Sequence, residues 1–535
     1  MKHFNITFKP DDEQISVHAG VTLLEAAGQA GIILNSVCGA KGTCRKCAVF
    51  LEPDGRQVLA CQHRVENDLT VTIPDTSRFF EQKILTEGIE TRPRYPPDIY
   101  YKYLKISPPD KIFGVAIDIG TTTVVAKLMN MTNGKCLSTQ AALNPQIQYG
   151  DDVITRIAYA QTDENLAELH KLIIDCINRL IFQFCRQTSI NPMQIYEICV
   201  VGNTTMNHIF LKFPVSQLGQ TPFKAFSVDA HDLPASELGL QINPAANVHT
   251  VENIAGFVGS DTTAVALAVD IGSAKDFTLA VDIGTNGELV LGTKEKLFAA
   301  SCAAGPAFEG ARIKYGSRAV EGAIQAVIAG EDDIDLDVIG NIPPRSICGS
   351  GLIDAVAVLL DLEIIDSTGR FNDRQKLKDH LPPRIFSRII KDNNEAAFCL
   401  YEGQDRVVLT QRDIRQVQLA KAAIRTGLKL LQKKLDLQEN GVHSTPYVTG
   451  IKQVLLAGAF GNYIRPKSAI RIGLLPDLPL ERIRFVGNAA AAGAEMLLLN
   501  SALRAEAKRL ARKIKYVEIA NEPDFATIFA DAMSF

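Results

Sequence analysis

The sequence has no apolar run long enough to cross a membrane and no large excess of charge of either sign. None of its apolar stretches approaches the 18 uninterrupted residues that mark a transmembrane helix. Residues 1–10 lack the apolar core of a secretory signal peptide. The formal net charge is only −4, which gives no whole-chain attraction for nucleic acid or anionic lipid. We therefore expect a cytoplasmic protein that binds neither nucleic acid nor membranes.

Several common cofactor motifs are also missing. No GxxxxGK[ST] sequence is present, which excludes a P-loop nucleotide site. The nine histidines show no HExxH or other metal-binding spacing. What remains is an ordinary globular composition, with 46% hydrophobic and 22% charged residues, so wholesale disorder is excluded. The length of 535 residues allows three or four domains.

Cysteine is informative because of its distribution. An odd total of 11 in a chain without a signal peptide argues against a disulfide framework. Four of the cysteines are clustered: Cys38, Cys44, Cys47 and Cys61. We expect the seven scattered ones to be small buried apolar residues. Four clustered thiolates are enough for either a tetrahedral zinc site or an iron–sulfur cluster.

The spacing C-x5-C-x2-C-x13-C favours the iron–sulfur cluster, because structural zinc usually takes two CxxC pairs. Three cysteines share one loop, in which Gly39 and Gly42 let the backbone curl so that its N–H groups face the sulfurs. Short predicted strands and one short helix surround this loop: 6–8, 15–17, 47–51 and 58–61, with the helix at 22–27.

Residues 1–78 resemble the ferredoxin-type β-grasp [2Fe–2S] domain. The resemblance implies that Cys38, Cys44, Cys47 and Cys61 hold the cluster, which would relay single electrons. The first spacing of five residues, where plant ferredoxins have four, and the short gap before the last cysteine depart from the family pattern. Zinc and a site that has lost its metal are the alternatives.

Residues 79–111 are rich in proline and tyrosine. Prolines at this density favour extended chain and prevent a long helix. We interpret the segment as a spacer; a hinge that lets the first domain swing is the alternative.

Beyond this spacer the chain repeats itself. The sequence AIDIGT at 116–121 returns as AVDIGT at 280–285. Each copy lies between two apolar runs, which predicts a hairpin with Asp118 or Asp282 at the end of its first strand and glycine in its turn. Such a turn brings backbone N–H groups and threonine hydroxyls close to an anion. The aspartate beside it can hold Mg²⁺ through water or orient an attacking water.

A third glycine-bearing turn follows an apolar strand within 454–462, and it would let the backbone approach a flat nucleoside. Small-residue segments at 256–264 and 487–494 predict helices that cross closely. Together these features resemble the superfamily of acetate and sugar kinases, heat-shock chaperones and actin. That resemblance implies two ribonuclease-H-like halves, at 112–275 and 276–535, that bind ATP with Mg²⁺ between them.

The same resemblance implies catalytic roles for Asp118 and Asp282. Nucleotide contacts are implied for the two phosphate turns and the adenosine turn: Gly120, Thr121, Thr122, Gly284, Thr285, Asn286, Gly458, Gly461 and Asn462. Kinases often carry another Gly-Thr where this chain has 286–288, which favours phosphate binding over phosphoryl transfer to a sugar. The segments 301–310 and 348–352 are also rich in small residues, and we interpret the second as a glycine turn ahead of an apolar helix at 353–362. Each either lines the nucleotide or contacts a partner, and tight turns explain the glycines equally well. Helix capping accounts for the polar residues of 201–206.

An electron relay joined to an ATP-binding region suggests electron delivery against an unfavourable potential, gated by nucleotide. The whole arrangement resembles the reductive activators of corrinoid proteins. In anaerobes these activators serve methyl-transferring systems, of which O-demethylases are an example. The resemblance implies ATP-dependent reduction of Co(II) to Co(I) on a corrinoid protein by a homodimer, with electrons from a ferredoxin or a reductase. No Asp-x-His-x-x-Gly signature is present, so we expect no corrinoid bound to this chain.

Four alternatives to this function stay open. One is a nucleotide-switched, chaperone-like binding protein whose cluster only senses redox state. The others are an activator of 2-hydroxyacyl-CoA dehydratases, an activator of another low-potential enzyme, and a small-molecule kinase with a structural zinc site.

Overall fold

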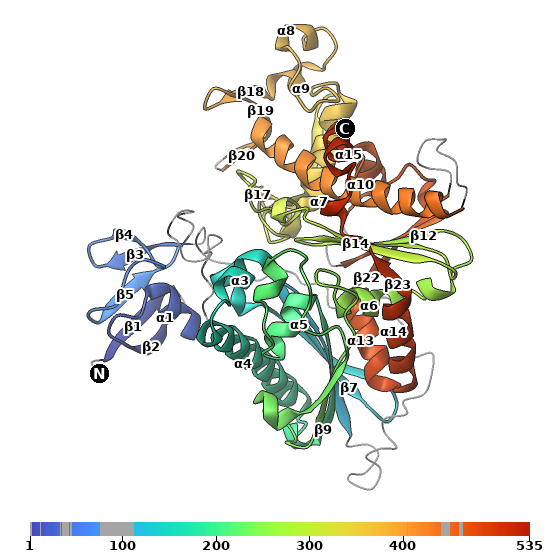
Figure 1. The fold of residues 1–535 in the computed structure, drawn as a ribbon. Coiled ribbons are helices and arrows are strands. Elements are labelled where there is room, and N and C mark those ends of the chain that lie inside the picture. Colours follow the sequence, from blue (N-terminus) through green and yellow to red (C-terminus); the bar gives the residue numbers. More distant parts are fainter. Residues whose placement is uncertain are drawn as a thin grey trace. The chain divides into compact units, whose positions relative to one another are not determined.

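The fold was analysed in a computed structural model of the chain (Figure 1). It describes residues 3–10, 12–30, 32, 34, 42, 45, 47–74, 77, 112–403, 405–439, 450–458 and 464–535. These residues form two compact units, one with the described residues up to Thr250 and one from Val251 onward. No helix among the described residues combines the length and the apolar character needed to span a membrane.

The first unit begins with a five-stranded sheet in the order β2-β1-β5-β3-β4. Its elements are β1 (His3–Lys9), β2 (Glu13–His18), α1 (Leu23–Gln29), β3 (Ala48–Glu52), β4 (Arg56–Leu59) and β5 (Leu69–Thr72). Alternation along β1 buries Ile6 and Phe8 completely against α1 and the other strands. A capping box starts α1, in which Glu25 accepts hydrogen bonds from the backbone and hydroxyl of Thr22. The predicted strands and helix of this domain are confirmed.

The rest of the first unit is a six-stranded sheet in the order β10-β11-β9-β6-β7-β8. Its strands are β6 (Phe113–Ile119), β7 (Thr123–Asn130), β8 (Cys136–Leu143), β9 (Ile195–Gly202), β10 (His231–Pro234) and β11 (Asn247–Thr250). Its helices are α3 (Val153–Tyr159), α4 (Asp163–Thr188) and α5 (Thr204–Phe210). The long helix α4 lies between β8 and β9 in the chain and packs on β7 and β8.

The second unit contains a sheet in the order β22-β21-β12-β13-β14-β23. Its strands are β12 (Thr278–Ile283), β13 (Gly287–Gly292), β14 (Leu297–Cys302), β21 (Gln453–Ala457), β22 (Ile483–Gly487) and β23 (Ile514–Tyr516). The helices are α6 (Ser260–Ala268), α10 (Gln411–Glu439), α12 (Pro466–Arg471), α13 (Ala489–Leu499), α14 (Ala502–Lys513) and α15 (Phe525–Ala532). The sheet lies between α10 with α15 and the group α6, α13 and α14 (Figure 1).

Five strands of each six-stranded sheet share one topology, and the sixth differs, because β10 lies beside β11 whereas β23 lies beside β14. In each, three consecutive antiparallel strands are followed by a long helix and by two further strands, and the last two add in parallel beside the first. Thus β6, β7, β8, β9 and β11 correspond to β12, β13, β14, β21 and β22. The internal repeat predicted from the paired AIDIGT and AVDIGT sequences is therefore a repeat of structure.

An insertion separates the two halves of the second sheet. It comprises β15 (Ala323–Ala329), β16 (Ile334–Val338), β17 (Ser346–Ile347), α7 (Gly349–Asp361), α8 (Arg374–Leu377), α9 (Pro383–Ser387), β18 (Ile389–Asp392), β19 (Glu395–Glu402) and β20 (Arg406–Thr410). It lies in the chain between β14 and α10, where the first half passes from β8 through a short 3₁₀ helix and α3 to α4. The glycines of 348–351 belong here, in the first turn of α7, and not to a turn ahead of that helix. A Cβ atom on Gly351 would lie 2.3 Å from the Ile324 carbonyl oxygen, so glycine lets α7 pack on β15.

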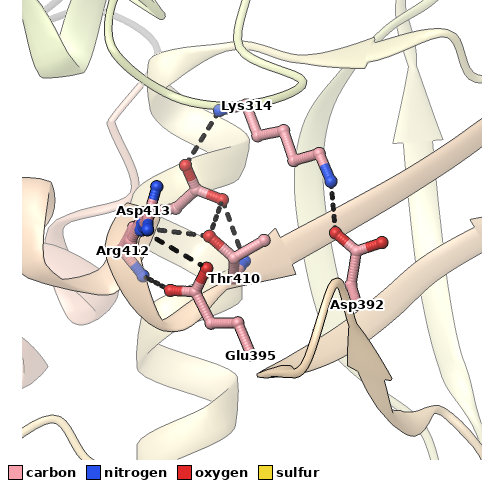
Figure 2. A network of polar contacts seen from close by, with 6 residues as sticks. All are labelled: Lys314, Asp392, Glu395, Thr410, Arg412 and Asp413. Carbon is pink, nitrogen blue, oxygen red and sulfur yellow. Dashed lines mark hydrogen bonds and ion pairs between the residues drawn. The ribbon is translucent and has the colours of Figure 1, made fainter.

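Polar contacts join the insertion to the start of α10 (Figure 2). Asp413 accepts 2.8 Å hydrogen bonds from the backbone of Lys314 and from the backbone and hydroxyl of Thr410. The ammonium group of Lys314 reaches Asp392 on the β18–β19 hairpin, and the backbone of Arg412 donates to Glu395 at 2.7 Å. These contacts hold the start of α10, the loop before β15 and the β18–β19 hairpin together.

The small-residue helices cross closely within the second unit, as predicted from their sequences. Helix α13 starts at an Asn488 cap and packs along α6. A Cβ atom on Gly493 would lie 2.3 Å from the carbonyl oxygen of Ala264, which is far inside van der Waals contact. Glycine at this position therefore allows the two backbones to touch.

We expect Gly493→Ala to destabilise the protein by about 1–3 kcal/mol, because the added methyl group overpacks the crossing. Helix propensity alone predicts the opposite sign, since alanine is favoured over glycine by about 1 kcal/mol. Denaturant unfolding distinguishes the two. Ala505→Gly on the exposed face of α14 serves as the control in which propensity alone acts. A more stable Gly493→Ala variant would contradict the close crossing.

Candidate functional site

Two of the four clustered cysteines lie in the described part of the chain, and they meet. Cys47 precedes β3 and Cys61 follows β4, and the antiparallel pairing of these strands brings both sulfurs to one end of the hairpin. The sulfurs are 3.3 Å apart and the residues are buried, with exposed fractions of 0% and 5%. This separation is too long for a disulfide and is within about 0.5 Å of the roughly 3.7 Å expected between two sulfurs bound at about 2.3 Å to one tetrahedral metal atom. Cys38, Cys44 and Gly39 lie outside the described residues.

Gln62 adds a polar contact to this pair. Its side-chain amide donates to the Cys61 sulfur at 3.6 Å and to the Cys61 carbonyl oxygen at 3.2 Å. Gly42 packs against the same side chain, since a Cβ atom there would lie 3.1 Å from Cγ of Gln62. Gly42 has a φ of +73°, a conformation that favours glycine and fits the predicted curl of the loop. Buried sulfurs with an N–H donor fit a cluster whose negative charge needs hydrogen bonds.

The first hairpin is formed by β6 and β7. Asp118 is the penultimate residue of β6, and Gly120, Thr121 and Thr122 make the turn. The Gly120 amide donates to the Thr123 carbonyl oxygen at 2.8 Å, and a Cβ atom on Gly120 would lie 2.7 Å from that oxygen. The predicted strand–turn–strand arrangement with aspartate before a glycine turn is confirmed.

Side chains from other elements hold this turn. The Asn144 amide donates to the Gly120 carbonyl oxygen and the Asn203 amide to the Thr121 hydroxyl, each at 2.9 Å. The fully buried Arg156 on α3 donates to the Thr121 carbonyl oxygen. Sequence reasoning missed these residues as parts of the site. Asn203 also caps α5, accepting from the Met206 amide at 3.0 Å, so the capping interpretation was correct but incomplete.

The repeat could have identified Asn203. In the first half, Val201 pairs with Asp118; in the second, Ala457 pairs with Asp282. The apolar strand sequences ICVVG at 198–202 and VLLAG at 454–458 are therefore equivalent, and each ends on a glycine. Asn203 thus occupies the first half's counterpart of the predicted adenosine turn.

The second hairpin, between β12 and β13, places Gly284, Thr285 and Asn286 in its turn, with a 2.9 Å bond from the Gly284 amide to the Asn286 carbonyl oxygen. The third predicted motif meets this hairpin. Gly458 has a φ of +86°, and a Cβ atom on it would lie 2.3 Å from a carboxylate oxygen of Asp282. Two segments far apart in the sequence are therefore in contact at one end of the sheet. Gly461 and Asn462 lie outside the described residues.

Three acidic side chains gather around this end of the second sheet. Glu288 on β13 stands directly opposite Asp282 and accepts a 3.4 Å hydrogen bond from Ser301 on β14. Asp261 is in the first turn of α6. Neither Glu288 nor Asp261 was predicted to belong to the site.

The protonation of these carboxyl groups is shifted because protein atoms replace water around them. Burial, followed by the negative charge of Asp261, raises the pKa of Asp282 to about 7. Burial also raises the pKa of Asp261 to about 6, although hydrogen bonds from Thr262 lower it. For Glu288, burial and the charges of Asp261 and Asp282 raise the pKa well above its usual range. Mutual repulsion of this kind is relieved by a cation.

These carboxylates fit a hydrated cation better than a bare one. No three His, Cys, Asp or Glu side chains within the described ranges converge tightly enough to hold a metal ion directly. Mg²⁺ usually keeps several of its water molecules in proteins. Asp282 and its neighbours can therefore accept hydrogen bonds from magnesium-bound water beside the glycine turn.

Known proteins match nearly the whole length of the chain. A family model described as the C-terminal domain of RACo, the ASKHA domain, matches residues 276–535, and the RACo middle region matches 113–274. A 2Fe-2S iron–sulfur cluster binding domain matches 6–66. The corrinoid activation enzyme RamQ of Eubacterium limosum is 32% identical over 97% of this chain and 97% of its own. The chain belongs to the family of reductive activators of corrinoid proteins.

Two further known proteins are similar to this chain. A solved structure of a reductive activator for corrinoid, iron–sulfur protein matches with a TM-score of 0.70 and 31% identity, covering 99% of this chain and 98% of that one. The [Co(II) methylated amine-specific corrinoid protein] reductase of Methanosarcina barkeri is 24% identical over 79% of this chain and 77% of its own. The predicted family, the ferredoxin-type [2Fe–2S] domain and the actin-like region that follows it are confirmed.

We expect Gln62→Leu to lower the reduction potential of the [2Fe–2S] cluster, because a hydrogen bond to sulfur stabilises the more negative, reduced state. A bond worth about 0.5–1.5 kcal/mol corresponds to roughly 20–60 mV for one electron. A redox titration followed by electron paramagnetic resonance measures the shift. Gln57→Leu, at an exposed position on β4, is the matched control. Equal potentials in wild type and Gln62→Leu would rule out the contact in the cluster-bound protein.

We expect Asp282→Asn to stabilise the protein by an amount that grows between about pH 4 and pH 7. The folded-state pKa is about 7 and the unfolded value about 3.9, so the unfolded chain loses its proton first as pH rises. The contribution of Asp282 to stability is thus present below pH 4 and lost as pH rises through 7. Denaturant unfolding without Mg²⁺ should show a gain of about 1–3 kcal/mol at neutral pH, after allowance for solvent screening.

The exposed Asp332→Asn provides the control for this experiment. A stability difference between wild type and Asp282→Asn that is the same at pH 5 and pH 8 would contradict the raised pKa.

Proposed function

We propose that this protein reduces the cobalt of a corrinoid protein from Co(II) to Co(I), one electron at a time, at the expense of ATP. The observation that carries the proposal is full-length similarity to a corrinoid activation enzyme, in a chain whose first domain binds a [2Fe–2S] cluster. A cluster of this type, when bound, transfers single electrons, which matches the one-electron change at cobalt. Cobalt belongs to the partner and is the substrate in this scheme.

Four thiolates would hold the cluster in the first domain: Cys38, Cys44, Cys47 and Cys61. The contact between the sulfurs of Cys47 and Cys61 supports this set, because neighbouring sulfurs share an iron in such clusters. Burial of both residues keeps water from that side of the cluster. Electrons would enter from a ferredoxin or a reductase and leave to the corrinoid partner.

The nucleotide site proposed for ATP with Mg²⁺ uses the turns of both repeats. Backbone N–H groups of both turns and the threonine hydroxyls beside Gly120 would bind the phosphates, and the turn that begins at Gly458 would bind the adenosine. Asp118 and Asp282 would hold magnesium-bound water or orient the attacking water. The raised pKa of Asp282 supports this role, since a nearby cation would release its proton and relieve the repulsion. The proposed set is completed by Thr121, Thr122, Thr285, Asn286, Gly461 and Asn462.

The family resemblance also supports a broader arrangement. We infer domains at 1–78, 112–275 and 276–535, with 79–111 as the spacer, and a cytoplasmic homodimer that serves the methyl-transferring system of an anaerobe, such as an O-demethylase. The matched ranges 6–66, 113–274 and 276–535 support this division.

The test is anaerobic absorption spectroscopy of candidate corrinoid proteins mixed with this protein, a low-potential reductant and Mg-ATP. We expect Co(I) to form only when ATP is present. Cys47→Ser should abolish its formation while ATP hydrolysis continues. Asp282→Asn should reduce both the formation of Co(I) and the rate of ATP hydrolysis by at least about 10-fold, as the loss of an outer-shell contact does at other metal sites. Cys136→Ser, far from the clustered cysteines in sequence, controls for loss of a thiol.

Absence of ATP-dependent Co(I) with every partner would overturn the proposal. Capture of unfolded proteins with no electron leaving the cluster would instead favour the chaperone-like alternative.

A further inference from the structure

The hydroxyl of Thr285, in the second phosphate turn, is already engaged by a residue outside that turn. It donates to a carboxylate oxygen of Glu309 at 2.6 Å, and Thr285 is only 7% exposed. A hydroxyl–carboxylate hydrogen bond of this length is of the stronger, charge-assisted kind. Glu309 lies within 301–310, the segment whose function the sequence left open.

The backbone around Glu309 keeps its carboxylate in place. The residue ends a short 3₁₀ helix, Pro306–Glu309, that packs against α7 and α10. Gly310 follows with a φ of +80°, and a Cβ atom on it would lie 2.3 Å from the Ser317 carbonyl oxygen. The loop therefore folds back on itself and brings Arg318 near the same carboxylate.

Arg318 supplies the balancing charge. Burial lowers the pKa of its guanidinium, and the negative charge of Glu309 opposes that shift. Glu309 thus has a hydroxyl donor on one of its oxygens and a cation near enough to interact with its charge. Its charge is compensated within the protein before any ligand arrives.

The direction of the Thr285 hydrogen bond decides what the hydroxyl can offer to a ligand. A threonine hydroxyl has one hydrogen and two acceptor positions. With its hydrogen given to Glu309, the oxygen can present only lone pairs to the turn. Lone pairs repel phosphate oxygens, but they accept hydrogen bonds from magnesium-bound water or coordinate the ion.

We propose that Glu309 is a positioning residue for the Thr285 hydroxyl. Because Glu309 takes the hydroxyl hydrogen, the oxygen of Thr285 is left to serve the magnesium ion and its water molecules and not the phosphates. The inference rests on the proposed nucleotide site and deepens it. Within the turn, the backbone N–H groups bind phosphate, while the threonine oxygen and Asp282 serve the cation.

Nucleotide binding with and without magnesium tests the division of roles. The affinity for a fluorescent ADP analogue is measured in EDTA, and the Mg²⁺ affinity is then measured at saturating analogue. In Glu309→Gln the amide can donate to Thr285 and reverse the hydrogen bond. We expect Mg²⁺ binding about tenfold weaker, which corresponds to ~1.4 kcal/mol. Nucleotide binding in EDTA should be unchanged or tighter.

Variants at Thr285 separate this role from a purely structural one. Thr285→Ser keeps the hydroxyl and should retain Mg²⁺ affinity, whereas Thr285→Val should lose it to the same extent as Glu309→Gln. The exposed Glu331→Gln is the matched control for charge loss. Circular dichroism verifies that each variant is folded.

Two results overturn the inference while leaving the nucleotide site intact. One is Mg²⁺ affinity in Glu309→Gln equal to that of wild type. The other is an equal loss of nucleotide affinity with and without Mg²⁺, which would mean that Thr285 donates to phosphate. Wild-type protein that binds no nucleotide under either condition would instead overturn the proposed site itself.

Discussion

The parallel pairing of each sheet's first strand with the strand that follows the long helix is the constraint on which both halves depend. This register puts the aspartate of each hairpin beside the end of the later strand. The later strand ends so close to the hairpin that glycine is favoured there: a Cβ atom on Gly202 would lie 2.7 Å from the Ile119 carbonyl oxygen, and one on Gly458 2.3 Å from a side-chain oxygen of Asp282. The hairpin turn, its aspartate and the glycine that ends the later strand therefore lie together in each half, because both sheets have the same strand register.

The fold was predictable where the signal is local or repeated. The hairpins follow from apolar runs that flank a glycine turn, and comparing the AIDIGT sequence with its second copy shows that the halves are equivalent. The insertion between β14 and α10 was not predicted, because it has no counterpart in the first half. Its strands pair mainly with one another, so nothing in the repeat marks where it begins. The turn assigned ahead of α7 was wrong for a related reason: Gly351 serves packing on β15, and contacts between distant segments leave no local pattern.

The residues of the candidate site likewise divide into those that a local motif identifies and those that only the fold brings together. Asp118 and Asp282 could be identified because each lies within its own motif. Glu288 has the appearance of an ordinary residue in an alternating strand, and a favourable helix dipole explains an acid such as Asp261 in a first turn. Their proximity depends on strand register and helix placement. Glu309 reaches Thr285 only through a loop whose path the sequence does not specify.

The acidic group at the end of the second sheet has a thermodynamic consequence. Carboxyl groups with pKa values of about 6 and 7 retain protons near neutrality when no cation is nearby. A cation that binds beside them expels those protons into the solvent, just as metal binding does at other titratable sites. The heat of binding would then depend on the ionisation enthalpy of the buffer. Protons would then compete with the cation that we propose for this site, so its affinity for the protein should fall as the pH drops through 7 and 6.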